Sequence, residues 1–279
     1  MCSILALLHI DGVKVQLIES APDYAEAVKI NNSRILIEAL TGKDGIANFS
    51  TLENESGLRG GLLRYHLDRL MSLGIIDSEV KGTYRLRFKT PLCYVFGAKN
   101  IKYAYIGLLG RKDSYSEPEP KVALSLLSEQ KIVPALVYVL TSPEGLADWK
   151  DSRLNCQWIL CYGDEIIDID AIQRKLTPQL TALLRDYSVI VDCTSSTKPA
   201  TIAYYDLAQR LLIPCIYVSE EKKSIRWLIS KENIRIRLGL GQTEPHRSKK
   251  SRPQRASSLR NSYPYVNPMR QPTASYIKP

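Results

Sequence analysis

The chain has 279 residues, of which 44% are hydrophobic and 24% are charged. These proportions are those of an average globular protein, and they exclude a collagen, a coiled coil and a wholly unstructured chain. No stretch reaches the ~20 apolar residues that a membrane helix requires. The apolar segment 1–10 follows no basic region and precedes no small-residue cleavage site, so we expect no secretory signal.

The net charge of +9 is unevenly distributed. Residues 241–279 carry eight Lys or Arg against one acidic residue, Glu244, and they hold six of the fifteen prolines. Such a segment buries too little apolar surface to offset its chain entropy, so we predict a disordered basic tail. The tail either attaches to nucleic acid by charge or keeps the chain in solution without a specific partner.

The six cysteines stand apart from one another in apolar runs. The closest pair, Cys156 and Cys161, has no histidine and no second pair nearby, so its spacing does not fit a zinc site. We therefore expect buried, reduced thiols, no metal and a cytoplasmic location.

Residues 1–30 are predicted to form a hairpin and a short helix. Asp11-Gly12 favours the positive φ angles of a two-residue turn, here between strands within residues 3–19. Pro22-Asp23 begins the helix. Whether this segment joins the next domain or an interface between chains is left open.

Residues 31–95 are predicted to form a second domain, which starts with three helices. Asn31-Asn32-Ser33 offers a cap for a helix over 34–40, and Ser50 offers one for a short helix that Gly57 ends. The third helix follows Leu58 and places an apolar stripe at helical spacing: Leu63, Leu67 and Leu70. Its opposite face presents Arg59, Arg64, Tyr65 and Asp68.

A hairpin is predicted after the third helix. Lys81-Gly82 turns the chain, and residues 83–88 alternate between two faces. Tyr84, Leu86 and Phe88 lie on one face, opposite Thr83, Arg85 and Arg87.

The pattern at 63–76, followed by a Gly-x-Tyr-x-Leu hairpin, resembles the winged helix-turn-helix of archaeal and bacterial ArsR-like regulators. The resemblance covers residues 33–89 and implies binding of double-stranded DNA. The alternative is a winged helix that serves only as a protein–protein joint. The candidate DNA-binding residues are Arg59, Arg64, Tyr65, His66, Lys81, Arg85 and Arg87.

Those residues divide by expected contact. Arg59, Arg64 and Tyr65 are expected in the major groove. The hairpin cations Lys81, Arg85 and Arg87 are expected on phosphates. His66 is expected to pack in the domain or to contact a phosphate.

Residues 101–240 show continuous apolar strands that alternate with helices, which is typical of a doubly wound parallel sheet in an α/β fold. We predict strands over 103–109, 135–140, 156–161, 188–192 and 213–218, helices over 120–129, 171–185 and 200–211, and a last hairpin around 225–238.

Three of these strands end in polar residues, at 110–114, 141–142 and 192–198. Ligands of open parallel sheets bind beyond the carboxyl ends of the strands. The third end places four hydroxyl side chains and Lys198 before Pro199, the expected first residue of a helix. Free N–H groups at a helix start attract anions, so a phosphate-bearing ligand is expected here.

Two nucleotide motifs are absent. The first turn has the spacing Gly107-x-x-Gly110 in place of G-x-G-x-x-G, and the second strand ends in Thr141-Ser142 without an acid for a ribose. This argues against a nicotinamide cofactor. A Walker A motif is also missing.

The first turn, 105–110, together with Asp192-Cys-Thr-Ser-Ser-Thr-Lys-Pro199, resembles the CRISPR-associated Rossmann fold (CARF) domain over about residues 101–220. The late motif of that family is D-x-T-G-G-T-K. The resemblance implies a homodimer whose paired loops bind a cyclic oligoadenylate, with cyclic tetra-adenylate as the expected effector and no cofactor. It points to Gly110, Arg111, Thr194, Ser195, Ser196, Thr197 and Lys198, to which the strand ends add Lys112, Thr141 and Ser142.

This chain departs from the family in two ways. Serines replace both glycines of the late motif, which narrows the approach to the backbone. The winged helix precedes the Rossmann domain, whereas better-known CARF regulators place it afterwards. An Arg59-x6-His66 spacing matches the RNase signature of HEPN domains, but both residues fall in the predicted DNA-contacting helix, so we interpret it as coincidence.

Three functions follow from these patterns. The first is a transcriptional regulator of a CRISPR system that responds to cyclic oligoadenylate and has no catalytic residues. The second is an enzyme, a metal-independent ring nuclease in which Lys198 and the neighbouring hydroxyls orient a ribose 2′-OH. The third is an interaction module that docks on a CRISPR complex.

Overall fold

The computed structural model describes residues 9–10, 13–14, 22–112, 117–152, 154–219 and 221–241. Of the predicted hairpin at 3–19, two short antiparallel strands are described, β1 (His9–Ile10) and β2 (Val13–Lys14). The rest of that hairpin lies outside the described residues, as do residues 242–279 of the predicted tail.

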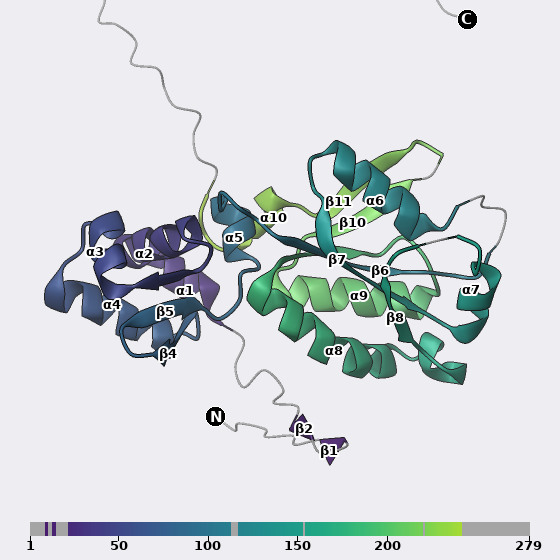
Figure 1. Cartoon of the computed structure of the whole chain (residues 1–279), viewed down its shortest axis with the longest axis horizontal. Coiled ribbons are helices and arrows are strands. Elements are labelled where there is room, and N and C mark those ends of the chain that lie inside the picture. The colour runs from purple at the N-terminus through teal and green to yellow at the C-terminus, as the bar shows by residue number, and fades with distance from the viewer. Residues whose placement is uncertain are drawn as a thin grey trace, which may run out of the picture. The chain divides into compact units, whose positions relative to one another are not determined.

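The first described part contains helices α1 (Tyr24–Lys29), α2 (Asn31–Gly42), α3 (Phe49–Ser56) and α4 (Gly60–Ser72). A three-stranded antiparallel sheet accompanies them, in the order β3-β5-β4. Its strands are β3 (Ile46–Asn48), β4 (Ile76–Val80) and β5 (Thr83–Leu86), and β4 and β5 form the predicted hairpin (Figure 1).

Two predicted helix caps are wrong. The second helix already begins at Asn31, so the asparagines lie within its first turn and the cap position is Ile30. The next helix is capped by Asn48, whose side-chain oxygen accepts from the Thr51 N–H (2.8 Å), and Ser50 lies inside the helix. In both cases the helix extends upstream of the expected cap, because such polar residues are also tolerated in a first turn.

The apolar stripe of α4 forms the core of this part. Leu63, Leu67 and Leu70 are fully buried, and they belong to the same apolar cluster as Leu36 and Ile37 of α2. The predicted helical periodicity is therefore confirmed for this helix.

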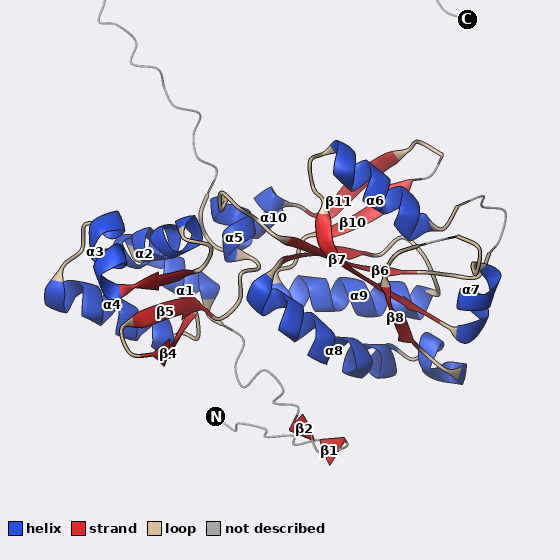
Figure 2. Cartoon of the chain, in the orientation of Figure 1, coloured by secondary structure: helices blue, strands red, loops and turns tan. Residues whose placement is uncertain are grey.

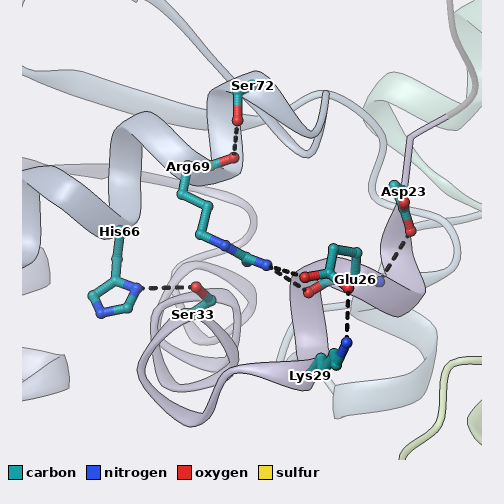
Figure 3. Close-up of polar contacts among 7 residues, drawn as sticks. All are labelled: Asp23, Glu26, Lys29, Ser33, His66, Arg69 and Ser72. Atoms are coloured by element: carbon teal, nitrogen blue, oxygen red, sulfur yellow. Dashed lines mark hydrogen bonds and ion pairs between the residues drawn. The ribbon is translucent and has the colours of Figure 1, made fainter.

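Two polar contacts also join α4 to its neighbours (Figure 3). The Arg69 guanidinium donates to the Glu26 carboxylate at 2.6 Å. His66 is buried, with Nδ1 3.1 Å from the Ser33 hydroxyl and Nε2 3.3 Å from the Asn32 side-chain amide. These contacts orient α4 against α1 and α2.

The second described part is built on a six-stranded sheet in the order β11-β10-β9-β6-β7-β8. The strands are β6 (Tyr103–Leu108), β7 (Pro134–Thr141), β8 (Gln157–Leu160), β9 (Ser188–Asp192), β10 (Cys215–Ser219) and β11 (Ser224–Ile229). All pairs are parallel except β10 with β11, which forms an antiparallel edge. The mixed α/β, mostly parallel architecture agrees with the prediction.

Helices cover both faces of this sheet (Figure 2). On one face lie α8 (Ile169–Asp186) and α9 (Lys198–Leu211), and on the other lies α6 (Glu119–Glu129). Alternate strand residues serve the two faces: Ile106 and Val191 belong to the cluster containing α8 and α9, and Tyr105 and Ile190 to the cluster containing α6. Four short elements complete this part: α5 (Leu92–Phe96), α7 (Pro143–Asp148), a 3-10 helix η1 (Gly163–Ile167) and α10 (Lys231–Arg237).

The hairpin predicted around 225–238 is wrong. The strand β11 pairs instead with β10, and the residues after it form α10. Ser230 starts this helix, since its hydroxyl accepts from the Asn233 N–H (3.1 Å) while the Asn233 side chain accepts from the Ser230 N–H (2.9 Å). This reciprocal cap ends the extended backbone at Ser230.

Within the described residues, every helix is too short or too polar to cross a bilayer.

We expect Leu67→Ala to lower the free energy of unfolding by about 2–5 kcal/mol, because it leaves a cavity under α4. The matched control is Leu62→Ala on the same helix, where the side chain is 50% exposed and the loss should stay within about 0.5 kcal/mol. Urea unfolding of the full chain, followed by circular dichroism, measures both. Equal losses would show that α4 is not packed as described.

Candidate functional site

The three polar strand ends meet at one edge of the sheet, because β9, β6 and β7 are neighbours in the strand order. They surround a cleft of about 520 Å³. The cleft is lined by Leu109, Gly110, Arg111, Glu119, Ser142, Glu144, Ile166, Thr194, Ser195, Ser196 and Thr197. A volume of this size suits a ligand as large as a nucleotide.

Asp192, the last residue of β9, holds the loop that follows it. Its Oδ1 accepts from the Thr194 N–H (2.9 Å) and from the Thr194 hydroxyl. Its Oδ2 accepts from the Tyr105 hydroxyl at 2.5 Å. Burial raises the pKa of Asp192 from 3.8 to about 6, against the opposing effect of these hydrogen bonds.

Three of the four hydroxyls in this loop are engaged within the protein. Thr194 Oγ1 also accepts from the Val218 N–H (2.8 Å), and Ser195 Oγ accepts from the Gly110 N–H (2.9 Å). The Thr197 hydroxyl donates to the Ile166 carbonyl (2.6 Å) and caps α9 by accepting from the Ala200 N–H (3.3 Å). Among the described residues, only Ser196 of the four makes no side-chain hydrogen bond.

The backbone of this loop is shaped for an anion. Ser196 has a φ of +78°, in the left-handed region that favours glycine, and it stands where the resembled motif has its second glycine. The amide N–H groups of residues 195–198 donate to no other described residue. Successive free amides around a left-handed residue form an anion-binding concavity, and here they adjoin the start of α9.

Gly110 allows the first loop to approach the third. A Cβ at this position would lie 3.1 Å from the Ser196 nitrogen and 3.2 Å from Ser195 Oγ, closer than ordinary contacts. The Gly110 carbonyl accepts from the indole N–H of Trp149 at 3.1 Å. The glycine is therefore needed for the close approach of two backbones, and the loop is anchored on both sides.

The cations of the first loop contact the end of α7. Arg111 Nε lies 2.6 Å from Asp148 Oδ2, and this hydrogen bond lowers the pKa of the Asp148 carboxyl. The Lys112 ammonium lies 5.3 Å from the centre of the Trp149 ring, in the range of a cation–π contact. Arg111 remains 67% exposed and borders the cleft.

Seven of the ten predicted ligand residues line the cleft, namely Gly110, Arg111, Ser142, Thr194, Ser195, Ser196 and Thr197. Thr141 is buried, and its hydroxyl donates to the Leu109 carbonyl (2.8 Å), so it supports the cleft from below. Lys112 lies over Trp149, and Lys198 is exposed at the first position of α9 without bordering the cleft.

Four lining residues escaped the sequence-based prediction: Leu109, Glu119, Glu144 and Ile166. Glu144 is exposed at the start of α7, and hydrogen bonding with the Ser142 side chain lowers its pKa. Glu119 is the first residue of α6, and its position between two prolines at a helix start was the signal available in the sequence. Ile166 enters through η1, which has no strong sequence signal.

The predicted DNA-binding residues fall into two groups. Arg59, Arg64 and Tyr65 are exposed at the start and along one side of α4, and Lys81 is exposed in the turn of the hairpin. The other three are engaged inside the protein. His66 is buried against Ser33 and Asn32, Arg85 pairs with Asp186, and Arg87 pairs with Asp77 at 3.1 Å.

In the part of the chain that the structure describes, no group of three or more His, Cys, Asp or Glu side chains is placed to hold a metal ion. Cys193, which follows β9, and Cys215, the first residue of the neighbouring β10, are both buried, and their sulfurs lie 3.1 Å apart. The hydrogen bond with Cys193 and burial raise the pKa of Cys215, so it is held as a thiol.

No family model matches this chain, and no curated protein matches it. Solved structures with partial likeness include Can2 from Sulfobacillus thermosulfidooxidans in complex with cyclic tetra-adenylate, at 18% identity over 46% of this chain and 35% of that one, with a TM-score of 0.35. Another is VC1899 from Vibrio cholerae, at 12% identity over 47% and 34%, with a TM-score of 0.36.

A further partial likeness is to Enterococcus italicus Csm6 bound to cyclic hexa-2′-fluoro-hexa-dAMP. Its identity is 15% over 50% of this chain and 39% of that one, with a TM-score of 0.34. The alignments thus span about a third of the length of these three structures. TM-scores below 0.5 do not establish a shared fold.

The pKa of Asp192 predicts a pH dependence. When the pKa of an acid is higher in the folded than in the unfolded chain, the folded state holds its proton to a higher pH. Stability therefore falls as the pH rises from the unfolded pKa to the folded pKa. As the pH rises from 3.8 to about 6, the free energy of unfolding of the wild type should therefore fall by up to about 3 kcal/mol relative to that of Asp192→Asn. Urea unfolding of both proteins across pH 4 to 7 measures the difference, and a constant difference would contradict the assignment.

Proposed function

We propose that this chain is a DNA-binding regulator that responds to a cyclic oligoadenylate and binds it in the cleft at the carboxyl ends of β6, β7 and β9. The observation that carries the proposal is the row of amides at residues 195–198, which donate to no other described residue and flank the left-handed Ser196; residues 195–197 line that cleft. Such a row recognises the oxygens of a phosphodiester without a metal. Arg111 at the rim adds a positive charge for a second phosphate.

We propose that the ligand is shared by two copies of the chain. A ring of repeated nucleotides has rotational symmetry, and a closed two-fold dimer presents the same loop twice to such a ring. A cleft of about 520 Å³ in one chain accommodates part of a tetranucleotide ring, and the second copy would supply the rest. The resemblance of the 192–199 loop to the CARF motif supports this arrangement.

For the first part of the chain we propose a winged helix. Three helices, α2 to α4, precede the β4–β5 hairpin, and β3 completes the small sheet. The side of α4 away from the core presents Arg64 and Tyr65, the latter 61% exposed. With Arg59 and Lys81 they form a surface for the major groove and its phosphates. Arg85, Arg87 and His66, being engaged internally, position this surface and do not contact DNA.

The contacts after the hairpin provide a route for coupling. The Lys89 N–H donates to the Leu184 carbonyl (2.7 Å), and the Thr90 hydroxyl donates to the Tyr187 carbonyl (3.1 Å). Both acceptors lie at the end of α8, whose start follows η1 and the Ile166 carbonyl that Thr197 binds. A ligand that reorders the loop would shift α8 and, through these hydrogen bonds, the β4–β5 hairpin. Ligand and DNA would alter each other's affinity equally.

The first prediction from this proposal concerns the amides. Ser196→Pro removes one N–H and forces a negative φ, so we expect at least a tenfold loss of affinity for cyclic tetra-adenylate. Ser196→Gly keeps the N–H and permits the positive φ, so it should bind within about threefold of the wild type. Calorimetric titration measures both, and thermal melting of each variant without ligand reports its folding.

Two results would contradict the ligand proposal. One is a wild type whose melting temperature and heat of titration do not respond to the ring. The other is a Ser196→Gly variant that loses binding as Ser196→Pro does, which would assign recognition to the hydroxyl. Chromatography of the titrated sample also shows whether the ring stays intact, since its hydrolysis would favour a ring nuclease.

The second prediction concerns DNA. We expect Arg59→Ala and Arg64→Ala each to weaken binding to the duplex upstream of the protein's own coding sequence by about 1–3 kcal/mol, roughly fivefold to 150-fold. Arg226→Ala is the matched control, since it removes the same charge from an exposed position on β11. Electrophoretic mobility shifts at low salt, with and without cyclic tetra-adenylate, measure the effect. No shift, or an equal loss in the control, would overturn the DNA proposal.

A further inference from the structure

One carboxylate in the cleft, that of Glu119, accepts no hydrogen bond from the described residues. Glu119 borders the cleft at the start of α6, and its side chain is buried, with 8% relative exposure. Its Oε2 atom is out of contact with solvent and accepts no hydrogen bond from any described residue. A buried carboxylate oxygen that is left unsatisfied costs free energy, so a donor supplied by a ligand would be strongly favoured.

The neighbours of Glu119 do not relieve this charge. Burial raises the pKa values of both Asp192 and Tyr105, and the negative charge of Glu119 raises them further. Asp192 is already hydrogen-bonded to Tyr105 and Thr194. Nearby cations are engaged elsewhere, since Arg111 pairs with Asp148 and Lys121 with Glu117. Within the described residues, the lining of the cleft thus combines amide donors that have no acceptor with a carboxylate oxygen that has no donor.

The amides of 195–198 and the Glu119 carboxylate would bind different parts of one ligand. The amides of 195–198 attract phosphate, whereas Glu119 repels it, so the group at Glu119 must be an uncharged or positive donor. In an adenine nucleotide the N–H donor is the exocyclic amino group of the base.

We infer that Glu119 selects the base of the ligand by accepting a hydrogen bond from the amino group of adenine. This assignment rests on the function proposed above, because it takes the phosphates to lie on the amides. Glu119 is then a specificity-determining residue, and Glu144, which borders the same cleft but is exposed, is not. A site built around a buried acceptor rejects an analogue that lacks the donor.

The test compares two rings that differ only at the base. In cyclic tetra-inosinate a carbonyl oxygen replaces the amino group and N1 carries a hydrogen, so the group at C6 that meets Glu119 changes from a donor to an acceptor. We expect the wild type to bind cyclic tetra-adenylate at least tenfold more tightly. In Glu119→Gln the side-chain amide can donate to that carbonyl, so the preference should fall at least fivefold or reverse. Glu144→Gln, the matched control, should keep the wild-type preference.

The possible outcomes separate this inference from the function on which it rests. If the wild type binds neither ring, both fall. If it binds cyclic tetra-adenylate but Glu119→Gln keeps the wild-type preference, the proposed function stands and this assignment is overturned. It is also overturned if Glu144→Gln changes the preference equally, or if magnesium alone binds the wild type and not Glu119→Gln. Glu119→Ala should weaken the binding of cyclic tetra-adenylate specifically. It is a control for any new contact that the side-chain amide of Glu119→Gln could make.

Discussion

The hydrogen bonds made by Asp192 are the constraint on which the candidate site depends. A buried carboxylate at the end of β9 collects the Thr194 amide, the Thr194 hydroxyl and the Tyr105 hydroxyl. Those donors are used within the loop, and the amides that follow have no acceptor among the described residues. The polar groups at the start of the loop are therefore hydrogen-bonded within the protein, while the amides that follow are available to an anion. Desolvation destabilises the charged form of Asp192, and the three hydrogen bonds compensate for only part of that cost, so the pKa of Asp192 stays raised.

The hydroxyl groups of the loop have a different role from the one that their number implied. Four hydroxyls before a helix resemble a set of phosphate ligands, yet Thr194, Ser195 and Thr197 bind the protein itself. They link the loop to β10, to the first turn and to η1. Because these side chains are bonded to three neighbouring elements, the backbone amides of the loop are the donors that remain for a ligand. Backbone donors are fixed in position and do not depend on a side-chain rotamer.

The lining of the cleft is mixed in charge, which narrows the range of ligands that it can bind. Its amides and Arg111 favour phosphate, while its carboxylates Glu119 and Glu144 disfavour it. A simple polyanion would meet repulsion from those carboxylates, whereas a nucleotide carries its negative charge at one end and neutral donors at the other. The distribution of charge thus supports a nucleotide ring over an inorganic phosphate chain. The two carboxylates differ in environment, since Glu119 is buried and Glu144 is exposed.

Local sequence patterns were sufficient for most elements. Continuous apolar runs marked the strands of the parallel sheet, and the spacing of Leu63, Leu67 and Leu70 marked the buried face of α4. These patterns succeed because burial on one face of a helix, or on both faces of a strand, repeats with the period of the backbone. The position of the cleft also followed from the sequence, since parallel strands place their polar ends at one edge.

Pairings between distant residues lay beyond such patterns. Arg85 meets Asp186 across 101 positions and His66 meets Ser33 across 33, so an alternating or helical pattern shows that these residues are polar but not what they bind. The same holds for Glu119, whose missing partner is a property of the assembled cleft. Periodicity reports which face of an element is buried, whereas the partner of a charge depends on how the elements pack, and packing is set by the whole chain.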